Sequence, residues 1–97
     1  MMITATYLRD LDKGWRSDAK LYSLSEPVPY GWDEEKALPT TKYVIVSAVI
    51  ADFSGPEAYI FPSDEKGEIL SWTEMDGSLR GTLKHEDAIY NAGWELA

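Results

Sequence analysis

The sequence predicts an α+β fold: a small antiparallel sheet of about four to five strands with one short C-terminal helix packed on it. Residues 43–51 form the one long apolar run of the chain and are rich in β-branched residues, which is typical of a buried strand. Residues 57–62 and 68–73 are two further β-rich runs, and the polar segment that joins them ends in a glycine, as in a hairpin. Residues 84–92 carry a helical pattern.

The longest apolar run should be the central strand. Side chains alternate between the two faces of a strand, and here Ile45 and Val49 share one face while Val46 belongs to the other. Both faces are apolar, so we expect the sheet to be covered on both sides at this strand. Further along, Pro62 lacks an amide donor and belongs at a strand end or a sheet edge. Gly67 suits the left-handed position of a type I turn with a G1 bulge.

Residues 3–28 are expected to form a first β-hairpin, or a strand with an irregular arm, with a turn near residues 12–14. Residues 19–24 support the hairpin, because part of this stretch alternates apolar and polar positions as a half-buried strand does. A helix over residues 7–15 is the competing interpretation, since several apolar residues there share helical spacing.

The whole chain, residues 1–97, is expected to form one domain, because domains commonly contain about 100–150 residues. Within it, residues 25–41 are expected to be a long connecting loop, since three prolines stand there among charged residues. Long ordered loops are often functional. Tyr30 and Trp32 lie in this loop, where large aromatic side chains either fold back over the core or stay exposed as binding anchors.

The helix expected at residues 84–92 has acidic residues in its first turn, where the helix dipole favours them, and Gly93 at the C′ position. At under three turns, it must gain its stability by packing against the sheet. A loop over residues 78–81 precedes it. Residues 94–96 alternate in character and predict a short terminal strand.

Charge is the most unusual bulk property of the chain, which carries 17 acidic and 9 basic residues for a net charge of −8. Residues 43–97 hold ten acidic and three basic residues, so this half carries seven of the eight net negative charges. Phosphate binding needs the opposite sign, so we expect no direct contact with DNA or RNA. A negative face that meets a basic protein is one interpretation, and a solvated surface that maintains solubility is the other.

We expect neither catalysis nor a cofactor nor a metal site. Ser78, His85 and Asp87 supply the residue types of a catalytic triad, but no nucleophile elbow surrounds the serine. A lone histidine at a helix start is more often a surface or capping residue, and metal binding needs a cluster of ligands. The turn at residues 64–68 gathers carboxylates without the ligand spacing of a calcium loop.

Composition favours the cytoplasm. The chain contains no cysteine, which excludes disulfides and thiolate zinc ligands. Its longest apolar run is far short of the roughly 20 residues that span a bilayer. The N-terminal residues lack a basic leader followed by an apolar stretch, so we expect no signal peptide and no membrane partner.

Several motifs of the second half together carry a resemblance: Tyr59-Ile60-Phe61-Pro62, Asp64, Gly67-Glu68-Ile69, Trp72, Gly77-Ser78-Leu79-Arg80-Gly81, His85-Glu86 and Ala92-Gly93-Trp94-Glu95. This pattern resembles a group of short, uncharacterised proteins of mycobacteriophages and related actinobacteria, well over residues 42–97 and weakly over residues 19–28. The resemblance implies a phage or prophage accessory protein that acts inside the host cell, and it implies no activity. Those proteins would carry an aspartate N-cap where this chain has Lys84, so the helix cap is in question here.

Two classes of function follow from these observations. The first is a small protein-binding module whose acidic half steers it to a basic surface on a host or phage protein, with a sharper version in which carboxylates mimic DNA phosphates. The second is a structural or assembly component that self-associates through a sheet edge. An enzyme that uses His85 is a distant third. The predicted protein-binding residues are Tyr30, Trp32, Asp64, Glu65 and Glu68.

Overall fold

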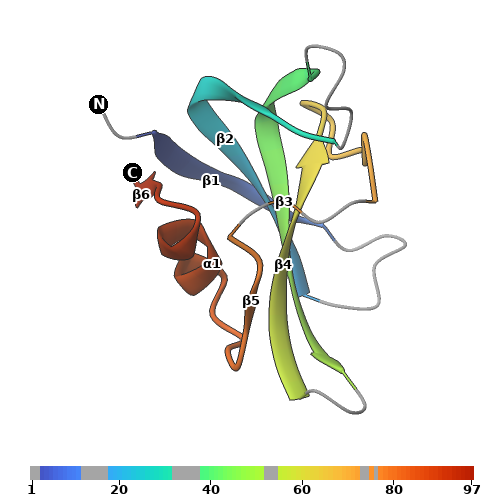
Figure 1. The fold of residues 1–97 in the computed structure, drawn as a ribbon, viewed down its shortest axis with the longest axis vertical. Helices are drawn as coiled ribbons and strands as arrows, with labels where there is room; N and C mark the ends of the chain where they lie inside the picture. Colours follow the sequence, from blue (N-terminus) through green and yellow to red (C-terminus); the bar gives the residue numbers. More distant parts are fainter. Residues whose placement is uncertain (1–2, 12–17, 32–37, 52–54, 73–74, 76) are drawn as a thin grey trace.

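The computed structural model describes residues 3–11, 18–31, 38–51, 55–72, 75 and 77–97 (Figure 1). In chain order the elements are β1 (Thr4–Leu11), β2 (Asp18–Pro29), β3 (Thr40–Ala51), β4 (Gly55–Ser63), β5 (Leu79–Arg80), α1 (His85–Asn91) and β6 (Glu95–Leu96). The strands form one twisted sheet in the order β5-β4-β3-β2-β1-β6, with α1 against one face (Figure 1). The predicted α+β class is therefore confirmed.

The number of strands was predicted too low, because the described residues hold six rather than four to five. β5 and β6 contain two residues each and lie at the two edges of the sheet. β5 pairs with β4 at residues where only a loop was expected. β6, the predicted terminal strand, runs parallel to β1, whereas the other strand pairs are antiparallel. A pair as short as that of β5 with β4 arises from closure of the tertiary structure and leaves no periodic signal in the sequence.

The third predicted run, residues 68–73, is not a strand over its described residues. It contacts β4 through an isolated bridge between Ser63 and Ile69 and through a hydrogen bond from the Leu70 N–H to the carbonyl of Pro62. The turn that joins the two segments does form as predicted, with Gly67 at φ +85°. Pro62 lies one residue from the end of β4, as its missing amide donor indicated.

β3 is the third strand of six and is buried on both faces, as predicted. On the face that α1 covers, Val44 and Val46 join a core with Ile60 of β4 and Ile89 of α1. On the opposite face, Ile45 lies in a second and smaller core. Alternation along one strand therefore supplies side chains to both cores. The burial ends before the strand does, since Val49 is only half-buried and Ile50 is 67% exposed.

β1 and β2 form the predicted first hairpin, and the alternative helix at residues 7–15 is wrong over its described part, residues 7–11. The predicted turn at residues 12–14 lies outside the described residues. The register shifts by one residue between Tyr7 and Arg9, which marks a β-bulge at Leu8. Before the bulge Ala5 packs in the helix-side core, and after it Leu11 packs in the second core. The bulge therefore reverses which face of the sheet the following side chains of β1 point to.

The Pro-rich connection is shorter than predicted at both ends. β2 extends to Pro29 and β3 begins at Thr40, and these two residues are register partners. The prolines are accommodated because the register between β2 and β3 is irregular from Ser23 to Val28, so this part of β2 does not need a regular ladder. Residues 32–37 of the connection lie outside the described part of the chain.

α1 begins and ends within one residue of the predicted helix. Lys84 is its N-cap residue and makes no side-chain capping bond, as its departure from aspartate implied. Gly93 has φ +89°, its N–H donates to the carbonyl of Tyr90, and the Trp94 N–H donates to that of Ile89. This pair of bonds is the Schellman motif, which satisfies the last carbonyls of the helix. Among the described residues no helix has the length and apolar character needed to cross a membrane.

Gly77 allows the chain before β5 to pass close to the end of α1. A Cβ built at Gly77 would lie 2.6 Å from the Cβ and 2.7 Å from the Cα of Ala92, and the residue has φ +106°. The Asn91 side-chain amide donates to the Gly77 carbonyl across the same contact. Gly81 also has a positive φ, of +92°, but nothing lies within 4 Å of its Cβ position.

The two faces of β3 give a first prediction. Ile45→Ala should lower the free energy of unfolding by about 2–4 kcal/mol, because it removes a fully buried side chain from the second core. Ile50→Ala, the same change five residues along the same strand, should stay within about 0.5 kcal/mol because Ile50 is exposed. Urea denaturation of both variants measures the difference. Equal midpoints for the two variants would show that the second core does not stabilise the fold.

The close approach at Gly77 gives a second prediction. Gly81→Ala should cost about 1 kcal/mol from its positive φ alone. Gly77→Ala should cost about 1–3 kcal/mol more, because its Cβ also collides with the backbone of α1 at Ala92. Thermal and urea unfolding of the matched pair separate the two effects. If Gly77→Ala is no less stable than Gly81→Ala, the contact with Ala92 is not as close as described.

Candidate functional site

The acidic turn after β4 is held together by its own backbone and by Asp64. The Asp64 N–H donates to the Glu68 carbonyl at 3.0 Å, and the Gly67 N–H donates to the Asp64 carbonyl at 3.1 Å. The Asp64 carboxylate accepts the N–H groups of Lys66 and Glu68, each at 2.9 Å. The left-handed Gly67 closes this arrangement. Asp64 is therefore occupied in shaping the turn, whereas Glu65 and Glu68 are exposed.

This turn packs across the face of the sheet that α1 does not cover. The Arg9 guanidinium donates to the carbonyl of Lys66, and a Cβ at Gly67 would lie 3.0 Å from the side chain of Leu11. Ile69, just after the turn, packs against the second core. The turn is thus attached to β1 and to the core beneath it, so its exposed carboxylates are presented from a defined position.

Exposure alternates along the segment that follows the turn. Glu68, Leu70 and Trp72 are exposed, whereas Ile69 and Ser71 between them are half-buried. Trp72 is 71% exposed, the highest value among the large hydrophobic side chains of the described residues. This segment places an acidic, an aliphatic and an aromatic side chain outward within five residues.

Trp72 rests on an aromatic row of β4. Its ring meets that of Phe61 edge to face, with centroids 5.7 Å apart, and Phe61 in turn contacts Tyr59 at 6.1 Å. Tyr59 and Phe61 are the register partners of Ser47 and Ile45, so the row lies on the face opposite α1. Phe61, Glu65, Glu68, Leu70 and Trp72 are termed the β4-turn surface below.

The predicted binding residues divide into two groups. Asp64, Glu65 and Glu68 do lie together on one turn, although Asp64 has the structural role just described. Tyr30 belongs to a different segment and is half-buried just after β2, where its N–H donates to the Pro39 carbonyl at 3.0 Å. Trp32 lies outside the described residues. An anchoring role for these two aromatic residues stays a prediction.

Trp72 is the residue that sequence analysis missed. It was assigned to a strand of the sheet, where an aromatic side chain is normally half-buried. The sequence did contain one signal for exposure. Trp72 lies two residues after Leu70 and four residues after the charged Glu68, which begins the run. Exposure depends on what covers the segment, and the sequence does not encode that locally.

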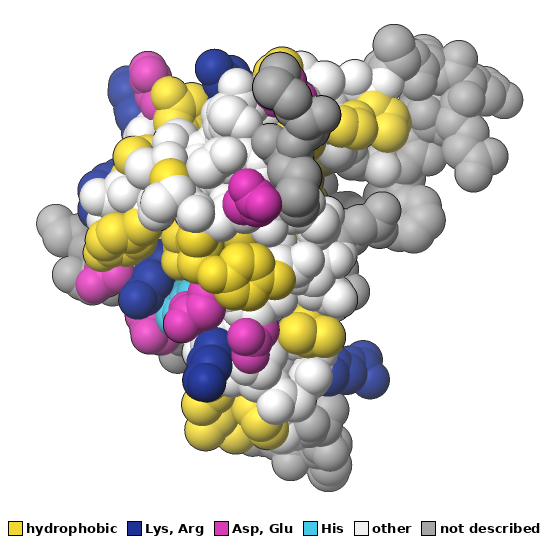
Figure 2. Space-filling view, turned by 90° about the vertical axis from the view of Figure 1, so that its left-hand side faces the viewer, with side chains coloured by type: hydrophobic (Ala, Val, Ile, Leu, Met, Phe, Trp, Pro, Cys, Tyr) yellow, Lys and Arg dark blue, Asp and Glu magenta, His cyan; other side chains and the backbone are white. Residues whose placement is uncertain are grey.

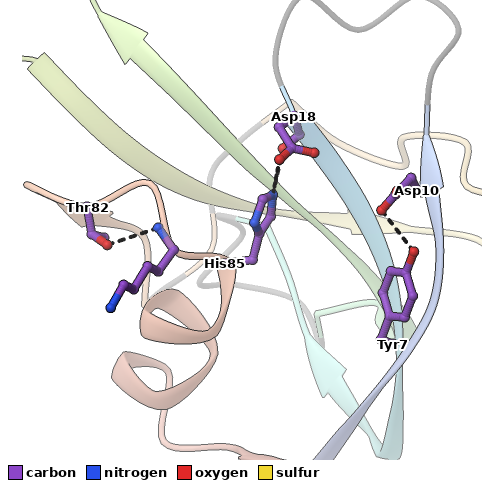
Figure 3. Close-up of polar contacts among 6 residues, drawn as sticks. Tyr7, Asp10, Asp18, Thr82 and His85 are labelled. Carbon is purple, nitrogen blue, oxygen red and sulfur yellow. Dashed lines mark hydrogen bonds and ion pairs between the residues drawn. The ribbon is translucent and has the colours of Figure 1, made fainter.

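The face that carries α1 has a different character. Figure 2 shows hydrophobic side chains there among acidic and basic ones that alternate over short distances. On this face the Tyr7 hydroxyl donates to Asp10 at 2.9 Å (Figure 3). The Lys20 ammonium lies 5.6 Å from the Tyr7 ring centroid. The hydrogen bond to Asp10 raises the pKa of Tyr7. Beside it, burial and then the Glu86 carboxylate raise the pKa of Tyr22 to about 12.

His85 holds α1 to the start of β2. Its Nε2 lies 2.7 Å from the backbone carbonyl of Asp18, to which it donates, and 3.9 Å from the Asp18 carboxylate (Figure 3). The prediction of a surface or capping histidine was wrong, because the side chain is buried between helix and sheet. Thr82, before the helix, accepts the Lys84 N–H and donates to the Asp87 carboxylate in the first turn.

The residues of a triad are not brought together. The Ser78 hydroxyl donates to the Met75 carbonyl and accepts the Ile60 N–H, so it fastens the chain to β4. His85 binds Asp18, and Asp87 binds Thr82. Within the described part of the chain, no group of three or more His, Asp or Glu side chains could hold a metal ion.

Tyr22 gives a third prediction, on pH dependence. Its pKa in the folded state, about 12, is higher than the ordinary 10.0. Its contribution to stability is therefore complete below about pH 10 and is lost as pH rises toward 12, because the unfolded state releases the proton first. Urea midpoints from about pH 9 to 12 should fall more steeply for wild type than for Tyr22→Phe. Tyr90→Phe, at an exposed site, should follow wild type; parallel curves for all three proteins would contradict the burial effect.

Comparison of the chain with protein-family models, with curated proteins and with solved structures finds no match in any of the three.

Proposed function

We propose that this chain is a small protein-binding module that docks on a basic protein through the β4-turn surface. The observation that carries the proposal is Trp72, a large aromatic side chain that is 71% exposed yet supported by Phe61. Exposed aromatic side chains on a supported base are typical binding anchors. The cytoplasmic phage or prophage accessory role implied by the resemblance is part of this proposal.

Charge complementarity supports a basic partner. Glu65 and Glu68 are exposed on the turn that precedes Trp72 in the chain, with the exposed Lys66 between them, and residues 43–97 carry seven of the eight net negative charges. Such a field accelerates encounter with a positively charged partner and disfavours acidic ones. The DNA-mimic version stays a prediction; it needs a continuous row of carboxylates, and Figure 2 shows both signs of charge interleaved on the helix-bearing face.

The alternative, self-association through a sheet edge, is less well supported by the described edges. β5 and β6 contain two residues each, so they offer little backbone for pairing. Beyond Ala5, β1 is no longer paired with β6. This part of β1 carries the bulge at Leu8 and the charged Arg9 and Asp10. Short edges, bulges and charges are the devices by which proteins prevent edge pairing. We therefore rank docking through the β4-turn surface first.

A fourth prediction tests this docking. The partner is first captured from host lysate at low and high salt, and binding kinetics are then measured with the purified partner. The association rate should fall as salt rises, because screening acts beyond about 8 Å at physiological ionic strength. Glu65→Lys with Glu68→Lys should lower the association rate further, and Trp72→Ala should raise the dissociation rate about fivefold or more.

Matched controls lie on other parts of the molecule. Glu26→Lys with Glu95→Lys makes the same change in net charge at exposed positions of β2 and β6. Tyr90→Ala removes an exposed aromatic ring from α1. Both controls should bind more like wild type than the corresponding test variants do. Equal losses in test and control variants, or an association rate independent of salt, would rule out this surface.

A further inference from the structure

The aromatic row under Trp72 also indicates what kind of side chain the partner contributes. Trp72 and Phe61 meet at an interplanar angle of 68°, and Phe61 and Tyr59 at 36°. Most of the indole surface of Trp72 remains exposed to solvent. An indole face attracts cations more strongly than the ring faces of tyrosine or phenylalanine do.

The same chain already shows this chemistry at another ring. On β1, Tyr7 is half exposed, Lys20 lies 5.6 Å from its ring centroid, and the Tyr7 hydroxyl donates to the Asp10 carboxylate. An exposed ring, a nearby carboxylate and a cation thus form a cluster within one molecule. The β4-turn surface presents a larger ring together with two exposed carboxylates, those of Glu65 and Glu68.

We infer that the partner places an arginine side chain against the indole of Trp72. A planar guanidinium stacks on aromatic faces and also pairs with carboxylates, so it suits both components of the β4-turn surface better than an ammonium does. The aliphatic part of the arginine side chain lies along Leu70, as long cationic side chains commonly do on apolar surface. This inference rests on the docking function proposed above and specifies its chemistry.

Two peptides of equal charge test the inference, hexa-arginine and hexalysine, titrated against wild type and two variants by calorimetry. Trp72→Leu keeps an apolar side chain and removes the ring, and Tyr90→Leu makes a similar change on α1. Trp72→Leu should weaken hexa-arginine binding by about two- to fivefold, the size of an exposed cation–π contact, and hexalysine binding by less. Tyr90→Leu should leave both affinities unchanged.

Hexa-arginine that does not bind wild type, or that binds Trp72→Leu and Tyr90→Leu equally well, would overturn the arginine contact. The kinetics with the captured partner separate this failure from failure of the docking proposal. If Trp72→Leu binds the partner as wild type does while Glu65→Lys with Glu68→Lys slows association, the surface docks but no arginine stacks on Trp72. If neither variant changes partner binding, both proposals are wrong.

Discussion

The rest of this structure depends on the burial of β3 on both of its faces. Exposing either apolar face of this strand to water would be unfavourable, so the chain must supply a separate packing element, or cover, for each face. α1 covers one face through Ile89, and the turn after β4 covers the other through Ile69. With so short a chain, each cover is small: a helix of seven residues and a single turn. Neither would be stable alone, so the sheet and its covers must form together.

The parts of the fold that could be predicted are those with a local physical cause. Alternating apolar residues on both faces identified β3, and Gly93 identified the end of α1 because its left-handed conformation resists side chains. Asp64 and Gly67 identified the turn for similar reasons. β5 could not be predicted, because two residues carry no period and its pairing depends on where β4 already lies. β6 was expected as a terminal strand, but its parallel pairing with β1 was not.

Of the proposed β4-turn surface, the exposed carboxylates could be expected from the sequence and the exposure of Trp72 could not. Most carboxylates of proteins lie at the surface, so Glu65 and Glu68 could be expected there from sequence alone. An aromatic residue can be buried or exposed, and the choice depends on its neighbours in space. Trp72 and Tyr30 illustrate both outcomes: the residue assigned to the sheet is the exposed one, and the residue assigned to a loop is half-buried beside β3.

The bulge at Leu8 makes the length of β1 as important as its composition. Because of this one additional residue, Arg9 and Leu11 face the second core, whereas Ala5 and Tyr7 face α1. Its removal would reverse the facing of every residue after it, which would send Leu11 and Arg9 away from the turn that they support. Substitutions at the exposed Leu8 do not change which face the later residues of β1 point to. β1 should therefore tolerate many changes of side chain here and few changes in the number of residues.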